Sequence, residues 1–284
     1  MPQAYETLFA DHRDIPDYEA LTVDDVAHAL ARRAHVIVPV GSVEQHGRHL
    51  PLGTDLYQAR EIARRASHLL SARGIPLLVG PAIPFGLRQY LGDCPRDLPG
   101  TINLRADTLR NLVTDICHEL VRHGFRIIHL LGSHVENDPV LQLVAKEVGE
   151  STEASVVTLH PLNGTLAAFE PLLASRGVEG HGGEEETANM LAIAPDLVRL
   201  DRAAPAVPSP LPGDPPANDR PVFLGGAIGR FKLPPSLASM EGDGIIGDPR
   251  GATAETGERI LDIVARWVAQ AVHREWDIWA SSPE

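Results

Sequence analysis

Apolar runs and amphipathic stretches alternate along most of this chain. Short runs of consecutive apolar residues are typical of buried strands, and they occur at 36–40, 76–79, 127–131 and 155–159. Between these runs, apolar residues recur every three or four positions, which is the spacing of one face of a helix. This spacing predicts helices at about 22–33, 55–73, 106–123, 139–148, 186–194 and 259–279.

Cap and turn residues support several of these boundaries. Thr22 precedes two acidic residues, as a helix N-cap does, and Gly124 follows the helix at 106–123, as a C-cap does. The stretch 84–103 is rich in glycine and proline and predicts a long loop. A second, proline-rich loop is predicted at 203–221, and structured patterns continue beyond it.

Strands separated by helices predict a mostly parallel sheet that is covered on both faces. We therefore expect an α/β fold, namely a three-layer α/β/α sandwich. A chain of 284 residues can form one large α/β domain or two small ones, and no internal repeat divides it. Because the proline-rich loop has structured patterns on both sides, we predict a single domain over residues 1–284. In such folds, ligands bind beyond the carboxyl ends of the strands.

Composition narrows the function classes. The formal net charge of −13 argues against nucleic acid or an anionic membrane surface as a partner. No apolar run approaches membrane-spanning length, and the first residues lack the pattern of a signal peptide. The two cysteines offer no disulfide framework, so we expect a cytoplasmic location. Cys117 lies in an apolar helical pattern and is expected in the core, which leaves Cys94 as the plausible reactive thiol.

Side chains suited to metal binding follow the first predicted strand. Glu44, His46 and Asp55 all fall within the stretch 41–55, directly after the apolar run. Carboxylates and neutral imidazoles suit zinc or manganese, and the absence of cysteine here argues against a closed structural zinc site. A polar loop is the alternative, but packing does not explain three potential ligands at the end of a buried strand. The pattern favours a metal-dependent enzyme with an open site.

Two further clusters repeat this combination of residue types. His134 and Glu136 follow the predicted strand at 127–131. His181 and Glu186 lie at the start of a predicted helix. Glu184 and Glu185 also lie there, and we expect them only to complement the helix dipole.

These clusters together resemble the creatininase (creatinine amidohydrolase) family. The motifs are Glu-Gln-His-Gly-x-His-Leu-Pro-Leu-x-Thr-Asp at 44–55, Gly-x-His-x-Glu-Asn at 132–137 and His-x-Gly-x-x-Glu-Thr at 181–187. Leu-Pro-Gly-Thr at 98–101 and Gly-Ile-Ile-Gly-Asp-Pro at 244–249 are also similar to the family. The resemblance extends from about residue 35 to residue 260 and implies a creatininase-like fold.

The resemblance implies a site for two divalent metal ions per chain, Zn²⁺ and/or Mn²⁺. Glu44 and His134 would bind one ion. His46 and Glu136 would bind the other, and Asp55 would bridge the two. Water held between two cations loses a proton near neutral pH, so the nucleophile would be a metal-bridging hydroxide.

The resemblance also implies roles for residues around the metals. Glu186 would be the catalytic general base and then general acid, and His181 would hydrogen-bond the substrate or the oxyanion. Asn137 would orient a metal ligand. Members of the family are commonly homohexamers, so we expect a homo-oligomer and most specifically a homohexamer.

Residues expected to shape the substrate differ from creatininase. Val135 stands where creatininase has tyrosine, and the residues just before His181 include no tryptophan, where creatininase has an aromatic lid. Arg48 replaces the usual proline, and it can contact substrate, a neighbouring subunit or only solvent. Creatinine itself is therefore not the favoured substrate.

These observations leave three hypotheses for the function. The first is ring-opening hydrolysis of a small cyclic amide or a related cyclic compound. The second keeps the metals but cleaves a carbon–carbon bond of a cyclic polyol diketone, as a 3-dehydro-scyllo-inosose hydrolase does. The third is a non-enzymatic metal-binding protein, and the presence of Glu186 and His181 beside the ligands argues against it.

The remaining histidines carry weaker signals. His160 follows the strand at 155–159, but no family motif contains it, so its role is ambiguous. His49 is expected to make a structural hydrogen bond. The others are expected at the surface or in packing, namely His12, His28, His35, His68, His118, His123, His129 and His273.

Overall fold

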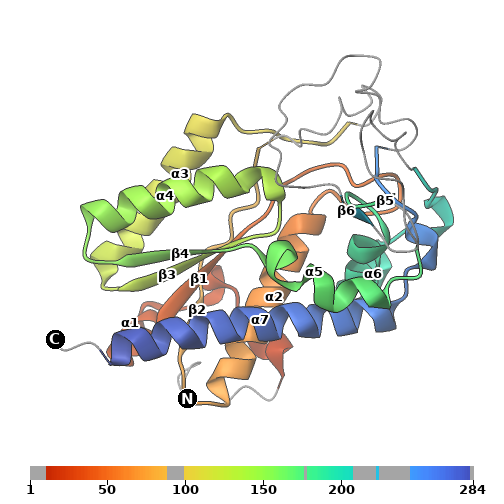
Figure 1. Ribbon diagram of the computed structural model, residues 1–284. Coiled ribbons are helices and arrows are strands. Elements are labelled where there is room, and N and C mark those ends of the chain that lie inside the picture. Colours follow the sequence, from red (N-terminus) through yellow and green to blue (C-terminus); the bar gives the residue numbers. More distant parts are fainter. Residues whose placement is uncertain (1–10, 88–98, 176–177, 207–221, 224–243, 282–284) are drawn as a thin grey trace.

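The centre of the molecule is a parallel sheet of four strands, in the order β2-β1-β3-β4 (Figure 1). The computed structural model describes residues 11–87, 99–175, 178–206, 222–223 and 244–281. The strands are β1 (His35–Val40), β2 (Leu77–Val79), β3 (Ile127–Gly132) and β4 (Ser155–Leu159). Val36 of β1 lies opposite Leu78 of β2 on one side and opposite Ile128 of β3 on the other. The predicted parallel sheet is confirmed.

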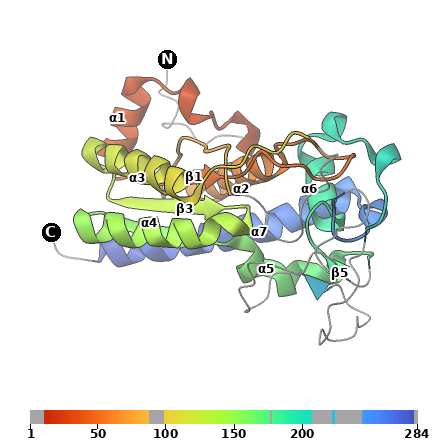
Figure 2. The same cartoon turned by 90° about the horizontal axis from the view of Figure 1, so that it is seen from above.

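Helices cover both faces of this sheet (Figures 1 and 2). One face carries α1 (Val23–Ala31), α3 (Ala106–His123) and α4 (Asp138–Ser151), and the other carries α2 (Thr54–Ser71) and α7 (Ala254–Ala280). Successive strand residues point to opposite faces. Val38 thus packs in the apolar cluster beneath α3 and α4, and Ile37 packs in the cluster beneath α2 and α7. The three-layer α/β/α prediction is therefore confirmed.

Local signals at the helix ends behave as the sequence predicts. The Thr22 side chain accepts a hydrogen bond from the Asp25 backbone at 3.2 Å, and the Asp25 carboxylate accepts one from the Thr22 backbone at 2.8 Å. This reciprocal pair caps α1. Gly124 ends α3 with a φ of 113°, a conformation that side chains other than glycine rarely adopt.

The structure contains elements that the hydrophobic pattern does not predict. One is α5 (Pro161–Phe169), a short helix that contains Gly164 and packs against Trp267 of α7. Two others are β5 (Val178–Glu179) and β6 (Val222–Phe223), which pair in parallel but are too short to give a pattern. The start of α7 is also earlier than predicted, because Thr253 caps the helix before its apolar periodicity begins.

The carboxyl ends of the strands face the region of α5 and α6 (Glu184–Ile193), as Figure 1 shows. Both helices pack against α7. Of the two predicted loops, residues 88–98 with Cys94 and residues 207–221 lie outside the described residues. Cys117 is buried in the core as expected, and burial raises the pKa of its thiol to about 12. Among the helices that the structure describes, none is long and apolar enough to cross a membrane.

Candidate active site

The carboxyl ends of β1 and β3 bring the predicted metal ligands together. Glu44 and His46 lie on the segment after β1, and Asp55 lies in the first turn of α2. His134 follows β3. All four residues are at most 5% exposed. Polar groups buried this deeply require partners or a bound ion.

Glu44, Asp55 and His134 form one ligand group. Nδ1 of His134 lies 3.4 Å from Oε2 of Glu44 and 3.3 Å from Oδ2 of Asp55. Both carboxylate oxygens are buried, and neither has a hydrogen-bond partner among the described residues. One ligand atom from each residue lies within 4.8 Å of the other two, so a single ion fits among them.

His46, Asp55 and Glu186 form a second group. Nε2 of His46 lies 3.2 Å from Oδ1 of Asp55 and 3.6 Å from Oε2 of Glu186. Asp55 therefore presents one oxygen to each group, which is the arrangement of a bridging carboxylate. Glu186 reaches this position from the first turn of α6, and the backbone of Gly182 donates a 2.6 Å hydrogen bond to its Oε2.

Glu136 belongs to neither group. Its Oε2 lies 3.5 Å from Nε2 of His134, whereas Nδ1 of the same ring faces Glu44 and Asp55. The imidazole of His134 thus stands between Glu136 and these carboxylates. The structure brings Glu186 beside His46, where the family resemblance places Glu136.

His181 lies at the margin of the ligand groups. Its Nδ1 is 3.9 Å from Oε2 of Glu44, and its ring centroid is 4.3 Å from that of His46. Its Nε2 lies 2.5 Å from the backbone oxygen of Gln45. With Glu44 and His46 it makes a third possible ligand group.

Backbone oxygens orient the two central imidazoles. Nδ1 of His46 lies 3.0 Å from the Glu44 oxygen, and Nε2 of His134 lies 2.8 Å from the Leu87 oxygen. A carbonyl oxygen only accepts hydrogen bonds, so the facing nitrogen of each ring carries the hydrogen. The other nitrogen, which faces the carboxylates, can then offer a lone pair to a metal.

Asn137 holds the frame of the site. It is fully buried, its Oδ1 accepts a 2.9 Å hydrogen bond from the Leu87 backbone, and its Nδ2 donates a 3.0 Å hydrogen bond to the Gly41 oxygen. Asn137 thereby joins the segment after β1 to the segment whose carbonyl orients His134. A Cβ atom on Gly86 would lie 2.6 Å from Oδ1 of Asn137, so glycine is required beside this amide.

The charges of the site favour bound cations. Burial alone would lower the pKa of His46, but Asp55 and Glu186 outweigh burial and raise it to about 10. Asp55 and Glu44 likewise outweigh burial at His134 and raise its pKa to about 10. Burial raises the pKa of Glu44 to about 7. Without a bound cation, the two buried imidazoles therefore carry protons among the carboxylates, and divalent cations would take the place of these protons.

The residues present fit a pair of divalent metal ions. The two groups share Asp55, their imidazoles are oriented, and two buried carboxylate oxygens lack partners among the described residues. Nitrogen and carboxylate donors without thiolates suit zinc or manganese. The arrangement can therefore support metal-assisted hydrolysis.

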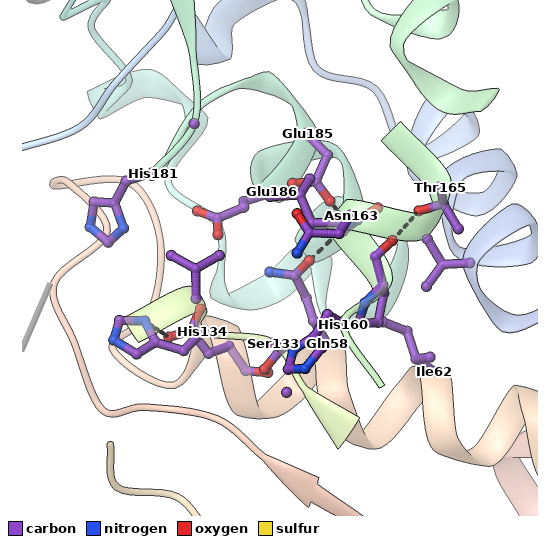
Figure 3. Close-up of a pocket in the computed structure, with 18 of the residues that line it drawn as sticks. Gln58, Ile62, Ser133, His134, His160, Asn163, Thr165, His181, Glu185 and Glu186 are labelled. Carbon is purple, nitrogen blue, oxygen red and sulfur yellow. Dashed lines mark hydrogen bonds and ion pairs between the residues drawn. The ribbon is translucent and has the colours of Figure 1, made fainter. Parts of the chain in front are cut away.

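A pocket of about 130 Å³ opens beside the ligand groups (Figure 3). Asp55, His134, His181 and Glu186 line it at one end. In Figure 3 the carboxylate of Glu186 points toward the end that holds His134 and His181. The pocket then continues toward α5, so it extends beyond the residues of the ligand groups.

Several residues of this pocket belong to none of the sequence motifs. Gln58 lies three positions after Asp55, and Asn189 lies three positions after Glu186, so each shares a helix face with a predicted site residue. This spacing was the available signal.

The two glutamates before Glu186 have structural partners, so the expectation that they only complement the helix dipole was wrong. Glu185 accepts a 2.6 Å hydrogen bond from Asn189 and lines the pocket. Glu184 is buried and accepts hydrogen bonds from the backbones of Ala174 and Ser175.

Two residues near the first motif lie outside the ligand groups. Arg48 is exposed and is not among the described residues that line the pocket. His49 is buried, and its Nε2 lies 2.9 Å from Oγ1 of Thr187. The expected structural hydrogen bond of His49 is thus present.

Comparison with known proteins places this geometry in a family. The model of the family described as "Creatininase: Creatinine amidohydrolase" matches residues 19–272. The creatinine amidohydrolase of Pseudomonas putida is 29% identical over 85% of this chain and 89% of its own length. The mycofactocin precursor peptide peptidase of Mycobacterium tuberculosis is 30% identical over 91% of this chain and 96% of its own length. A solved manganese form of creatininase matches with a TM-score of 0.70 and 27% identity, over 92% of this chain and 99% of that one.

Proposed function

The chain belongs to the creatininase family, and we propose that it is a two-metal hydrolase that cleaves an amide bond of a small substrate. Ring opening of a cyclic amide is the expected reaction. The observation that carries the proposal is the pair of three-residue ligand groups that share Asp55. Two relatives support it, because one is named an amidohydrolase and the other a peptidase, and both names denote amide cleavage.

We assign the ions as Zn²⁺ and/or Mn²⁺. Glu44, Asp55 and His134 would hold one ion, and His46 and Asp55 would hold the other together with Glu186 or, after a side-chain rearrangement, Glu136. Two such ions would supply an activated water molecule as nucleophile and would polarise the substrate carbonyl. The manganese form of the similar creatininase structure supports this choice.

Glu186 is the proposed proton carrier. It is half-buried at the pocket wall, and the loss of water around it raises the pKa of its carboxyl group. A carboxylate with a raised pKa takes a proton from water more readily and can then deliver it to the leaving nitrogen. The hydrogen bond from Gly182 fixes Oε2 for this transfer.

Three further residues would support the reaction. His181 lines the pocket beside Glu186, where it would contact the substrate or the oxyanion. Asn137 would keep His134 in place through Leu87. Arg48 would act only if substrate or a neighbouring subunit reaches the outer face of its loop.

The test is an NMR-followed hydrolysis assay on protein loaded with manganese or zinc. The panel contains creatinine, other cyclic amides, linear dipeptides and a cyclic polyol diketone. We expect cleavage of at least one amide, loss of that activity with a chelator and recovery when metal is returned. Protein that binds two metals per chain and cleaves no amide would contradict the proposal. Cleavage of the diketone alone would support the carbon–carbon hydrolase, and no cleavage of any compound would favour a metal-binding protein.

We further propose a cytoplasmic homo-oligomer, with a homohexamer as the specific expectation from the family resemblance. Light scattering on the metal-loaded protein gives the mass directly. A mass of six chains would support the hexamer, and the mass of one chain would contradict any homo-oligomer.

A further inference from the structure

The pocket has a second half that the metal centre and Glu186 do not use. It extends from the ligand groups to α5, and its walls come from α2, α5, α6 and α7. Figure 3 shows Gln58 between the His134 end and the end formed by His160, Thr165 and Ile62. We call this region, lined by Gln58, Asn189, Ile62, Phe169, Val264 and His160, the distal subsite.

A pair of side-chain amides forms one wall of the distal subsite. Nδ2 of Asn189 donates to Oε1 of Gln58 at 2.8 Å and to Oε1 of Glu185 at 2.6 Å. These two bonds fix the orientation of the Asn189 amide. Its Oδ1 is consequently left buried without a partner among the described residues.

This pair is complementary to an amide group. Oε1 of Gln58 is occupied by Asn189, so its Nε2 remains to donate a hydrogen bond to a carbonyl oxygen. Oδ1 of Asn189 remains to accept a hydrogen bond from an N–H group. A secondary amide of a bound molecule offers both a carbonyl oxygen and an N–H group.

The far end of the distal subsite is apolar. Ile62, Phe169 and Val264 line it and are at most 5% exposed. The hydroxyl of Thr165, which also lines it, donates a 2.7 Å hydrogen bond to the Pro161 oxygen and is therefore already used. An apolar substituent gains free energy on entering such a space, whereas hydroxyl groups would lose their water there.

His160 and Asp138 close the distal subsite. Nδ1 of His160 lies 2.7 Å from Oδ1 of Asp138, and both residues line the pocket. A Cβ atom on Gly132 would lie 3.0 Å from that same oxygen of Asp138, so glycine leaves the room that the pair needs. Nε2 of His160 has no hydrogen-bond partner among the residues that the structure describes. Asp138 thus lies beside an imidazole whose Nδ1 and Nε2 both lack a hydrogen-bond partner among the described residues, so Nε2 remains for a ligand.

We propose that the distal subsite selects the substrate of this enzyme as an amide with an apolar substituent beside the cleaved bond and a second amide group. This inference rests on the proposed amide hydrolysis. The Gln58–Asn189 pair binds the second amide, the apolar end takes the substituent, and His160 is a positioning residue at the end of the pocket. The substrate class is a cyclic or linear short peptide or N-acyl amide, rather than an unsubstituted ring or a polyol.

The first experiment compares substrates that differ only in the substituent. Wild-type, metal-loaded enzyme should cleave a leucine-containing N-acyl dipeptide with a kcat/KM about tenfold or more above that of its glycine counterpart. Ile62→Ala should reduce this ratio by about tenfold because it removes part of the apolar wall. Leu70→Ala is the matched control, since Leu70 lies in the same apolar cluster on α2 but does not line the pocket. Equal changes of the ratio in both variants would overturn the proposal.

The second experiment tests His160. His160→Gln should raise KM for the leucine substrate by about tenfold and change kcat much less, with unchanged metal content. His68→Gln is the control, because His68 is a half-buried histidine on α2 outside the pocket lining. An unchanged KM in His160→Gln would contradict its positioning role.

Failure of this inference is distinguishable from failure of the proposed function. If wild-type enzyme cleaves cyclic amides and ignores the leucine–glycine difference, the amide hydrolase stands and the distal subsite is wrongly assigned. If metal-loaded enzyme cleaves no amide at all, the proposed function fails and the inference fails with it.

Discussion

Two pairs of buried histidines belong to the same two strands, one pair within the strands and the other beyond their carboxyl ends, and their pKa values shift in opposite directions. His35 begins β1 and His129 lies within β3, whereas His46 and His134 follow the other ends of these strands. All four are at most 5% exposed. Burial lowers the pKa of His35 to about 4 and that of His129 to about 3, while the pKa of His46 and of His134 is raised to about 10.

The neighbours of each pair explain the difference. Nδ1 of His35 lies 3.1 Å from Nε2 of His129, and the His35 ring packs 5.2 Å from the Trp276 ring. His46 and His134 instead face the carboxylate of Asp55. A buried imidazole among aromatic rings stays neutral and packs, whereas one among carboxylates attracts positive charge. Burial of a histidine therefore does not identify a metal site, but burial beside carboxylates does.

The largest expected effect comes from removing the shared carboxylate. Asp55→Asn keeps the shape of the side chain but loses the charge that both ligand groups require. We expect a loss of bound metal and a fall in amide hydrolysis of about 10⁴-fold or more. Metal analysis and the NMR assay measure the two effects. Asp107→Asn, at an exposed aspartate in the first turn of α3, is the control. Two tightly bound metals and near-normal activity in Asp55→Asn would contradict the role of Asp55 as the shared ligand.

Glu186→Gln separates proton transfer from metal binding. We expect a fall in kcat of about 10²–10⁴-fold, because the amide cannot carry the proton. The group of Glu44, Asp55 and His134 should keep its ion, since Glu186 is not part of it. Rates and metal content are measured on the same samples. If kcat is unchanged, Glu186 has no catalytic role, and if all metal is lost, it is mainly a ligand.

Asn137→Ala tests the hydrogen bonds that hold His134 in place. This change removes the hydrogen bonds to Leu87 and Gly41, and Leu87 no longer holds His134 firmly. We expect metal affinity to fall by about 10–100-fold, as is typical when a residue that orients ligands is lost. Competition with a chromogenic chelator measures it. Affinity equal to that of wild type would show that Asn137 only packs.

Alkaline pH should destabilise the metal-free protein through His46 and His134. The pKa of His46 and of His134 is about 10 in the folded state and about 6.5 in the unfolded state. Between these two pH values the folded state therefore binds protons that the unfolded state releases. Their contribution to stability is full below pH 6.5 and is lost as the pH rises toward 10. The melting temperature of metal-free protein should therefore fall by several degrees between pH 7 and 10. His46→Gln should flatten this slope, and an unchanged slope would contradict the assignment.

Acid pH should act through His35 and His129, and this effect on stability should be the smallest. The lowered pKa of His129 means that the unfolded state binds a proton below 6.5 while the folded state resists it down to about 3. Its contribution is full above pH 6.5 and is lost as the pH falls. His129→Leu should weaken the acid dependence of the melting temperature by a few degrees and leave metal binding unchanged. Loss of metal in this variant would show that His129 is coupled to the metal ligands.

Much of this arrangement could be predicted from the sequence. Apolar runs gave the four strands, and amphipathic spacing gave the helices that cover them. The rule that ligands bind beyond strand ends predicted that Glu44, His46 and His134 lie near one another, and the structure places them together. The short helix α5 was missed, because its helical state depends on packing against α7 more than on its own apolar pattern.

The sequence by itself determined the layers of the fold, the family and the set of candidate ligands, because periodicity and motif spacing are local properties of the chain. Only the tertiary structure decided that Glu186 rather than Glu136 lies beside His46, and that His160 meets Asp138 in the same pocket. These pairings join residues on different elements. They depend on where a side chain points after the layers have packed, and no local pattern encodes that direction.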